Sequence, residues 1–309
     1  KIMNKKQALT NINQRITDAI VAQMEAGANW LKPFTGAELA PTNALTGKQY
    51  NGVNRLYLSL VGGGYFATWK QWKQLGATWK EGVNSDTDSH PVIYAAPKIY
   101  EKKNSKGEKE SRKVYLTQWS NVYSAHDVEL PEKLEAKLFG DKDEPVVDLT
   151  KTLEEVDTYI KNIGCAIRHQ AGGRAYSSDA TNQITMPLRT EFIDNDHGSA
   201  TEHYYSTLFH EITHWTGSDL RLKRTKGKFF GDAEYGFEEL CAELGAAFHC
   251  QARGIAKVDD TRESHATYLA SWIKGCKDQP DAIMKAARLA QASVTYCDSL
   301  QPDAAEKAA

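Results

Sequence analysis

The segment FHEITHWTG contains two histidines four residues apart, His210 and His214, with Glu211 directly after the first. In a helix, residues i and i+4 project from one face, so both imidazoles can bind a single cation. Glu211 lies beside them and can accept a proton from a water molecule activated at that cation. The pattern therefore predicts a metal site, with His210 and His214 as ligands and Glu211 as general base, in preference to two buried core histidines.

A catalytic metal site of this kind needs a third protein ligand. The segment EYGFEELCAELGAAFHC, residues 234–250, has apolar residues at helical spacing, and its Glu239 and Glu243 share one face. We assign Glu239, 25 residues after His214, as the third ligand and Glu243 as the carboxylate that orients a ligating histidine. Two alternatives stay open: Glu238 or Glu243 exchanges roles with Glu239, or the three acids form a solvated face.

The spacing after the second histidine separates two classes of metal site. The metzincin pattern HExxHxxGxxH is excluded because Leu220 stands where its third histidine belongs, although Gly217 matches its glycine. The arrangement resembles the gluzincin pattern ExxxD, with glutamate in place of aspartate. Two nitrogens and one oxygen favour one divalent ion per chain, zinc first, with manganese able to substitute. Candidate donors to an oxyanion are Tyr235, His203 and Tyr205, among which the sequence does not choose.

A peptide substrate would need a strand with which to pair along the cleft. The segment GGRAYSSDATNQITMPLRTEF contains a short alternating run from Asn182 to Met186, and Pro187 ends it. We therefore expect an edge strand before the HExxH helix, followed by the glutamate helix, which is the zincin order.

The N-terminal part mixes helices and strands, so the fold class we expect is α+β. Residues 11–27 predict an amphipathic helix that ends at Gly27, and two short helices are expected around GVNRLYLSLV and FATWKQWKQLG. HPVIYAAPKIYEKK and SRKVYLTQWSNVYSAHDV alternate apolar and polar residues around the charged tip NSKGEKE. This pattern is typical of a long β-hairpin.

Charge divides the chain into two parts. Residues 1–130 carry 17 Lys and Arg against 11 Asp and Glu, a net charge of +6, whereas residues 131–309 carry 21 against 29, a net charge of −8. The change falls in PEKLEAKLFGDKDEPVVDLT, residues 131–150, a charged segment that contains two prolines. With 309 residues, the chain exceeds the usual size of one domain. We expect two domains, 1–130 and 151–309, joined by a linker over 131–150.

Five of the seven tryptophans lie in the first 130 residues. Aromatic and ammonium groups side by side suit single-stranded DNA, because unpaired bases stack on indoles while lysines neutralise phosphates. The alternative is that Trp69 and Trp72, three apart on a predicted helix, belong to the core. The candidate DNA contacts are the interleaved residues Trp69, Lys70, Trp72, Lys73, Trp79 and Lys80.

The sequence also bears on the compartment. No apolar run approaches the roughly 18–20 residues that span a bilayer, so we expect no membrane partner. Five cysteines, an odd number without a CxxC pair, argue against a disulfide framework. A reducing cytoplasm fits these features.

Several segments together resemble the ArdC-type antirestriction family, namely NALTGKQYNGVNRLYL, YFATWKQWKQLGA, PVIYAAPKIYEKK, QITMP, LFHEITHWTGSDLRLKR and FEELCAELGAAF. In that family an N-terminal single-stranded-DNA-binding domain, shared with plasmid TraC-type primases, precedes a zincin-like metallopeptidase domain. The resemblance implies a plasmid-borne protein that protects incoming conjugative DNA from restriction in the cytoplasm of the recipient bacterium. Carried over by motif position, His210, Glu211 and His214 form the metallopeptidase signature and Glu239 is the third ligand.

A second function class uses the same two parts. In it, the protein is a DNA-activated metalloprotease that cleaves a host DNA-bound protein, such as a restriction factor, or DNA–protein crosslinks. The intact Glu211 argues against an inactive site. The pattern indicates a zinc-type metallopeptidase site and leaves enzymatic turnover undecided.

Overall fold

The structure is a computed structural model. It contains both helices and strands, which confirms the predicted α+β class. The chain divides into two compact units, which are described separately below. Gly27, where the first helix is expected to end, Trp30, one of the five tryptophans in the first 130 residues, and part of the expected linker lie outside the described residues. The described residues are 5–26, 40–103, 109–140, 149–172, 174–195, 198–224, 233–255, 263–279 and 281–302.

The first unit comprises Lys1–Ile16, Asn43–Lys48 and Tyr65–Gly140. Its main sheet has the strand order β1-β2-β5-β4, and β3 pairs separately with β6. Its elements are the first part of α1 (Lys5–Glu25), β1 (Thr42–Asn43) at the border between the units, β2 (Tyr65–Ala67), α3 (Trp69–Gln74), β3 (Thr78–Trp79), β4 (His90–Lys103), β5 (Lys109–Ser124), β6 (Val128–Glu129) and α4 (Glu132–Phe139).

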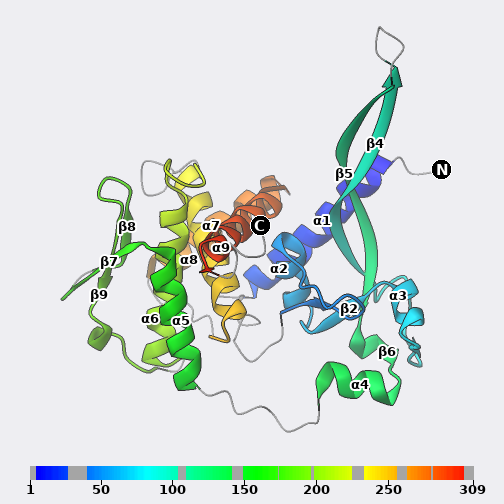
Figure 1. Ribbon diagram of the computed structural model, residues 1–309, viewed down its shortest axis with the longest axis horizontal. Helices are drawn as coiled ribbons and strands as arrows, with labels where there is room; N and C mark the ends of the chain where they lie inside the picture. The colour runs from blue at the N-terminus through cyan, green and yellow to red at the C-terminus, as the bar shows by residue number, and fades with distance from the viewer. Residues whose placement is uncertain are drawn as a thin grey trace. The chain divides into compact units, whose positions relative to one another are not determined.

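The predicted long hairpin is confirmed and is the largest feature of this unit (Figure 1). Strands β4 and β5 pair antiparallel from His90↔Val122 to Lys103↔Lys109. Strand β2 joins β5 only near the base of the hairpin, where Phe66 pairs with Ser124. Residues 104–108, within the expected tip, lie outside the described residues.

A small core beneath the hairpin base is built around Trp72. Its side chain is fully buried, and its indole N–H donates a hydrogen bond to the Tyr123 carbonyl oxygen over 3.0 Å. The prediction that Trp72 contacts DNA is therefore wrong, because its indole presents no face on which a base can stack. The core alternative holds for this residue: Trp72 packs in one cluster with Ala67 and Val128.

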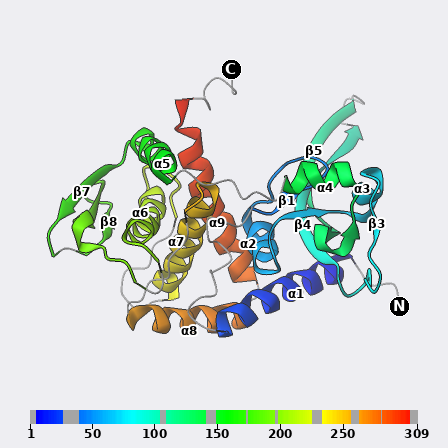
Figure 2. The same ribbon diagram turned by 90° about the horizontal axis from the view of Figure 1, so that it is seen from below.

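The second unit comprises Thr17–Thr42, Gln49–Gly64 and Asp141–Ala309. Helix α6 lies between a three-stranded sheet and α7, and α9 packs on α7 (Figure 2). Its elements are the rest of α1, α2 (Gly52–Leu60), α5 (Leu149–Ile163), β7 (Ala166–Gln170), β8 (Tyr176–Ser178), β9 (Gln183–Pro187), α6 (Ala200–Thr216), α7 (Ala233–Ala252), α8 (Glu263–Asp278) and α9 (Asp281–Ser299). None of the helices in the described part of the chain is long and apolar enough to cross a bilayer.

Helix α2 belongs to this second unit, although it lies within the first 130 residues. Its Arg55 side chain is buried and donates hydrogen bonds to Gln251 Oε1 over 2.6 Å and to the Phe248 carbonyl oxygen over 3.0 Å. The two units are thus not contiguous in sequence, whereas the expected domains are. The boundaries at 130 and 150 stay a prediction.

The expected edge strand is in the middle of its sheet. Strand β9 runs parallel to β7 on one side and antiparallel to β8 on the other, so the prediction of an edge at this strand is wrong. Ile184, Thr185 and Met186 are all buried, and consecutive buried residues are typical of a central strand. Pro187 is tolerated because it is the last residue of β9, where little ladder pairing is lost.

Helices α6 and α7 form as predicted and approach each other closely. Helix α6 begins with a capping box in which Ser199 and Glu202 bond to each other's backbone N–H groups. On α7, a Cβ atom at Gly245 would lie 2.4 Å from Thr213 Oγ1 on α6. Glycine is therefore needed at this position to let the two backbones approach.

A buried histidine gives a test of this packing. His249 is fully buried and stacked on Phe209, with ring centroids 4.9 Å apart, and neither ring nitrogen has a hydrogen-bond partner among the described residues. Burial, together with the charges of Arg253 and Arg55, holds the pKa of His249 well below its ordinary value. The folded state therefore keeps the imidazole neutral, whereas the unfolded chain takes up a proton below about pH 6.5.

We predict that His249→Phe raises the free energy of unfolding at neutral pH by about 1 kcal/mol or more, because it removes buried unpaired polar atoms. Below about pH 6.5 the wild type should lose up to about 1.4 kcal/mol more per pH unit than the variant. Urea unfolding between pH 5 and 8 measures both effects, with removal of the exposed His126 as control. A variant that is less stable and keeps the wild-type pH slope would show that His249 is not held neutral by burial.

Candidate metal centre

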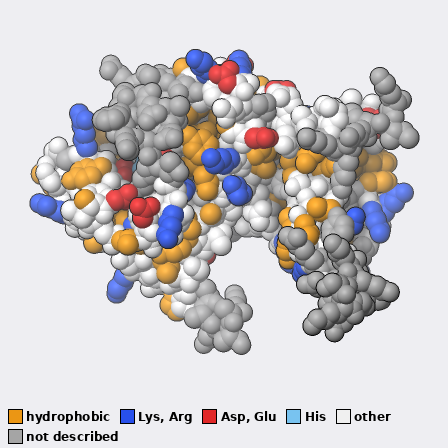
Figure 3. Space-filling model, turned by 90° about the horizontal axis from the view of Figure 1, so that it is seen from above, with side chains coloured by type: hydrophobic (Ala, Val, Ile, Leu, Met, Phe, Trp, Pro, Cys, Tyr) orange, Lys and Arg blue, Asp and Glu red, His pale blue; other side chains and the backbone are white. Residues whose placement is uncertain are grey.

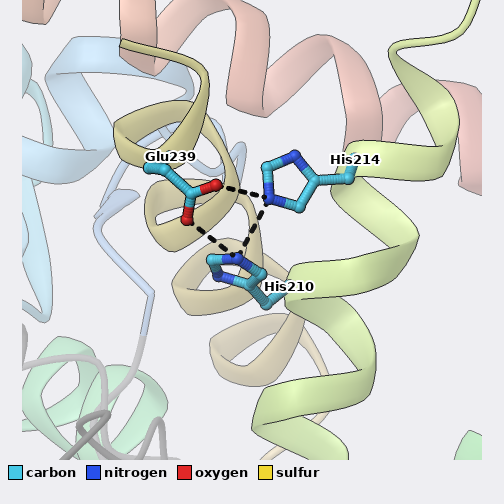
Figure 4. Close-up of side chains that lie close together, drawn as sticks. All are labelled: His210, His214 and Glu239. Atoms are coloured by element: carbon cyan, nitrogen blue, oxygen red, sulfur yellow. Dashed lines mark hydrogen bonds and ion pairs between the residues drawn. The ribbon is translucent and has the colours of Figure 1, made fainter. Parts of the chain in front are cut away.

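The three predicted ligands come together between α6 and α7 (Figure 4). His210 Nε2 lies 3.5 Å from Glu239 Oε2, and His214 Nε2 lies 3.4 Å from Glu239 Oε1. The two Nε2 atoms are 3.1 Å apart. The side chains are largely buried, with exposed fractions of 8% for His210 and 14% for each of the other two. The i, i+4 spacing on α6 and one turn of α7 therefore bring three ligand atoms to one point.

Each imidazole has a second carboxylate at its other nitrogen. His210 Nδ1 lies 3.1 Å from Glu243 Oε1, as expected for a carboxylate that orients a ligand. His214 Nδ1 lies 3.1 Å from Glu238 Oε1, a contact that the sequence does not single out. A proton on each Nδ1 satisfies these carboxylates and leaves both Nε2 lone pairs directed at the Glu239 carboxylate.

Sequence reasoning missed Arg224, which neutralises Glu238. Its guanidinium donates to Glu238 through Nε over 3.0 Å and Nη2 over 2.7 Å, and it also bonds the Thr213 carbonyl oxygen and Thr216 Oγ1. A Cβ atom at Gly217 would lie 2.7 Å from Nη2, so this glycine leaves room for the guanidinium. The only signal in the sequence is the basic run LRLKR shortly after the HExxH helix.

The pKa values of the cluster are set by two opposing effects, burial and the hydrogen bonds between the histidines and the carboxylates. Burial alone would lower the pKa of both histidines, but hydrogen bonds to the glutamates raise the pKa of His210 well above its ordinary value and that of His214 to about 9. Burial likewise opposes ionisation of Glu238, yet its bonds to His214 and Arg224 lower its pKa to about 2. The pKa of Glu239 is also lowered, through His210 and His214.

This donor set fits a divalent cation. The two Nε2 atoms lie 3.1 Å apart and both face the Glu239 carboxylate, so two imidazolium N–H groups placed there repel each other. The site thus has Lewis-basic atoms converging within 4.8 Å of one another, in a buried place where negative charge is costly. A cation bound by these three side chains would replace the facing protons and neutralise the buried carboxylate. The full set is two nitrogens and one carboxylate, as in His₂Glu catalytic zinc sites.

The other predicted catalytic groups are Glu211 and the three candidate oxyanion donors. Glu211 is 5% exposed and follows His210 on α6. The Tyr205 hydroxyl donates to Asp157 over 2.7 Å, and His203 Nε2 lies 3.0 Å from Asn195 Oδ1. The side chain of Tyr235, on the first turn of α7, lies outside the described residues. A role for these side chains as oxyanion donors stays a prediction.

In the first unit, the remaining candidate DNA contacts lie on α3, on β3 and directly after β3. Trp69 and Trp79 are half-buried and stack on each other, with ring centroids 3.8 Å apart. Lys73 Nζ lies 5.4 Å from the Trp69 ring centroid. Lys70 and Lys73 are exposed and Lys80 is half-buried. The two indoles therefore use one face each on the other, which leaves less aromatic surface for bases than the sequence suggests.

Comparisons with known proteins assign both parts of the chain. Residues 10–123 match the family described as the N-terminal domain of anti-restriction factor ArdC, and residues 154–289 match a family described as zincin-like metallopeptidase. The sequence is 30% identical over 284 residues to the DNA primase TraC of Escherichia coli, covering 88% of this chain and 19% of the primase. The chain thus spans about a fifth of the length of that relative.

Solved structures match along nearly the whole chain. The crystal structure of the antirestriction ArdC protein from plasmid R388, in its metal-free form, is 31% identical with a TM-score of 0.69, covering 93% of this chain and 97% of that protein. The Mn(II)-bound structure of the same protein matches with 28% identity and a TM-score of 0.67 over the same shares of both chains. Similarity in both parts and at full length shows that the chain belongs to the ArdC-type antirestriction family, with a zincin-like C-terminal domain.

Proposed function

We propose that this protein binds single-stranded DNA and protects incoming conjugative DNA from restriction in the cytoplasm of the recipient bacterium. The observation that carries the proposal is the full-length similarity to a plasmid antirestriction protein, which includes the N-terminal domain. Coating of the entering strand, before its complement is made, would hinder an endonuclease. This mechanism needs binding that does not depend on base sequence.

The surface of the protein is compatible with such binding. Lysine and arginine side chains stand at the surface beside apolar ones on the face drawn in Figure 3. Exposed Lys70 and Lys73 lie on α3 next to the stacked Trp69 and Trp79. Ammonium groups neutralise phosphates, and aromatic edges and faces contact unpaired bases, so contacts of this kind are tolerant of sequence.

We further propose that His210, His214 and Glu239 hold one divalent ion. Zinc is the first candidate for two nitrogens and one oxygen, and the Mn(II)-bound structure of the plasmid relative supports manganese as a substitute. Bound there, the ion would supply a Lewis acid that polarises a peptide carbonyl and lowers the pKa of water.

The residues of the chain supply the remaining chemistry of a peptidase. Glu243 accepts a hydrogen bond from His210 Nδ1–H, and Glu238 accepts one from His214 Nδ1–H. These bonds fix the tautomer in which Nε2 is free to bind the ion. Glu211 takes the proton from the attacking water and returns it to the leaving amine. A host protein bound to DNA, such as a restriction factor, is the substrate class that this activity would serve.

Salt dependence tests the DNA-binding proposal. We predict that the full chain binds single-stranded oligonucleotides with little sequence preference and more tightly than duplex, and that affinity falls steeply with salt because counterions are released. Fluorescence anisotropy at several salt concentrations measures this. The full chain is the right sample because α2 belongs to the second unit. Undetectable binding would overturn the proposal.

Glu211→Gln separates protection from proteolysis. We predict that the variant keeps its fold, metal content and DNA affinity. Its rate of peptide hydrolysis should fall by two or more orders of magnitude, because the general base is gone. Plasmid DNA entering a restricting host should still be protected. Glu202→Gln, an acid at the start of the same helix, is the control. Lost protection in the Glu211 variant would instead make proteolysis the mechanism.

A further inference from the structure

In the outer part of the β4–β5 hairpin, the described side chains are exposed or half-buried, and none of them is fully buried. We call residues 93–99 of β4 and 113–119 of β5 the hairpin stem. Strand β2 pairs with β5 only at Tyr123 and Ser124, so both edges of the stem lie beyond its reach. Three large side chains of the stem are strongly exposed: Tyr94 at 47%, Ile99 at 66% and Tyr115 at 62%. Several exposed apolar side chains of this size on a two-stranded ribbon are typical of a surface that binds a partner.

The pairing register assigns these side chains to two faces. Directly opposed residues of an antiparallel pair project to the same side. Tyr115 is opposite Pro97, and Lys113 is opposite Ile99, so these four residues share one face, which we call the Tyr115 face. Tyr94 lies on the other face, where its hydroxyl is 3.3 Å from Ser120 Oγ.

The positive charge of the hairpin favours a polyanion as its binding partner. Residues 90–100 and 111–124 contain three Lys and Arg and no Asp or Glu, and residues 101–110 add four Lys against three Glu, so the net charge of the hairpin is +4. Lys113 Nζ lies 5.4 Å from the Tyr115 ring centroid. An aromatic ring with an ammonium group beside it can stack on a base while the ammonium neutralises a neighbouring phosphate.

The sequence of the stem argues against the other occupants. Pro97 lies on β4, the edge strand of the sheet, where it interrupts strand pairing with a second copy of the chain. A ribbon that reads duplex DNA in the major groove uses side chains that hydrogen-bond base edges, such as Arg, Asn or Gln. The Tyr115 face instead presents an aromatic ring, a proline and an isoleucine, which suit stacking and apolar contact with unpaired bases.

We propose that the Tyr115 face of the hairpin stem is a principal binding surface for single-stranded DNA. This proposal rests on the proposed function, since it assigns the surface that carries out DNA binding. Seven residue pairs extend over about 20 Å of strand, enough for contact with several nucleotides. The Tyr115 ring stacks on a base, Ile99 and Pro97 add apolar contact, and Lys113 contacts the backbone.

Substitutions on the two faces test the proposal in the full chain with an oligothymidylate probe. Tyr115→Ala should weaken binding about tenfold or more, and Tyr115→Phe should restore it, because the ring and not the hydroxyl is used. Lys113→Ala should make the plot of log affinity against log salt less steep by about 0.7, the value for one phosphate contact on a single strand. Tyr94→Ala, on the opposite face, and Tyr176→Ala, an exposed tyrosine of the second unit, are the matched controls.

The outcomes distinguish this proposal from the one on which it rests. If the wild type does not bind the probe, the proposed function itself fails. If the wild type binds and Tyr115→Ala binds equally well with an unchanged salt slope, only the assignment of this face is overturned. A larger effect of Tyr94→Ala than of Tyr115→Ala would also overturn it. Sedimentation velocity serves as a further check: loss of self-association in Tyr115→Ala with DNA binding intact would identify the face as a contact between copies.

Discussion

Three carboxylates of α7 lie largely buried beside two histidines of α6, and this concentration of charge is the constraint on which the second unit depends. Buried carboxylates are costly unless they are paired and hydrogen-bonded. Arg224 pairs with Glu238, and the two Nδ1 atoms face Glu238 and Glu243. Glu239 is left facing both Nε2 atoms, and only protons or a cation can complete its surroundings. The same geometry that gathers this charge prepares the site to bind a cation.

The packing of the helices follows from this arrangement. Ligand atoms from two helices meet only if the backbones approach closely, and Gly245 permits this by leaving room for Thr213. Gly217 does the same for the guanidinium of Arg224, and its backbone is not left-handed (φ −74°). The metzincin-like glycine of the motif is therefore explained by a close contact rather than by a turn. The central strand β9 packs on α6 through Ile184 and Met186, which supports the helix from the other side.

Local periodicity explains which features are predictable from the sequence. His210 and His214 on α6, and Glu239 and Glu243 on α7, are each about one helical turn apart, so the face that each pair shares can be inferred without a structure. Arg224 is not predictable because it acts across 14 residues from a segment with no regular structure. The sheet order and the burial of Trp72 also depend on long-range contacts. Spacing places Trp72 on a helix but does not tell a core face from a binding face.

Anomalous diffraction from crystals grown with zinc or manganese, measured on both sides of the absorption edge, decides whether His210, His214 and Glu239 form one cation site that relieves the buried charge. We expect a single strong peak at about 2.0–2.2 Å from both Nε2 atoms and from a Glu239 carboxylate oxygen. A peak held instead by Glu238 or Glu243, or no peak at the two imidazoles, would contradict this assignment of the ligands.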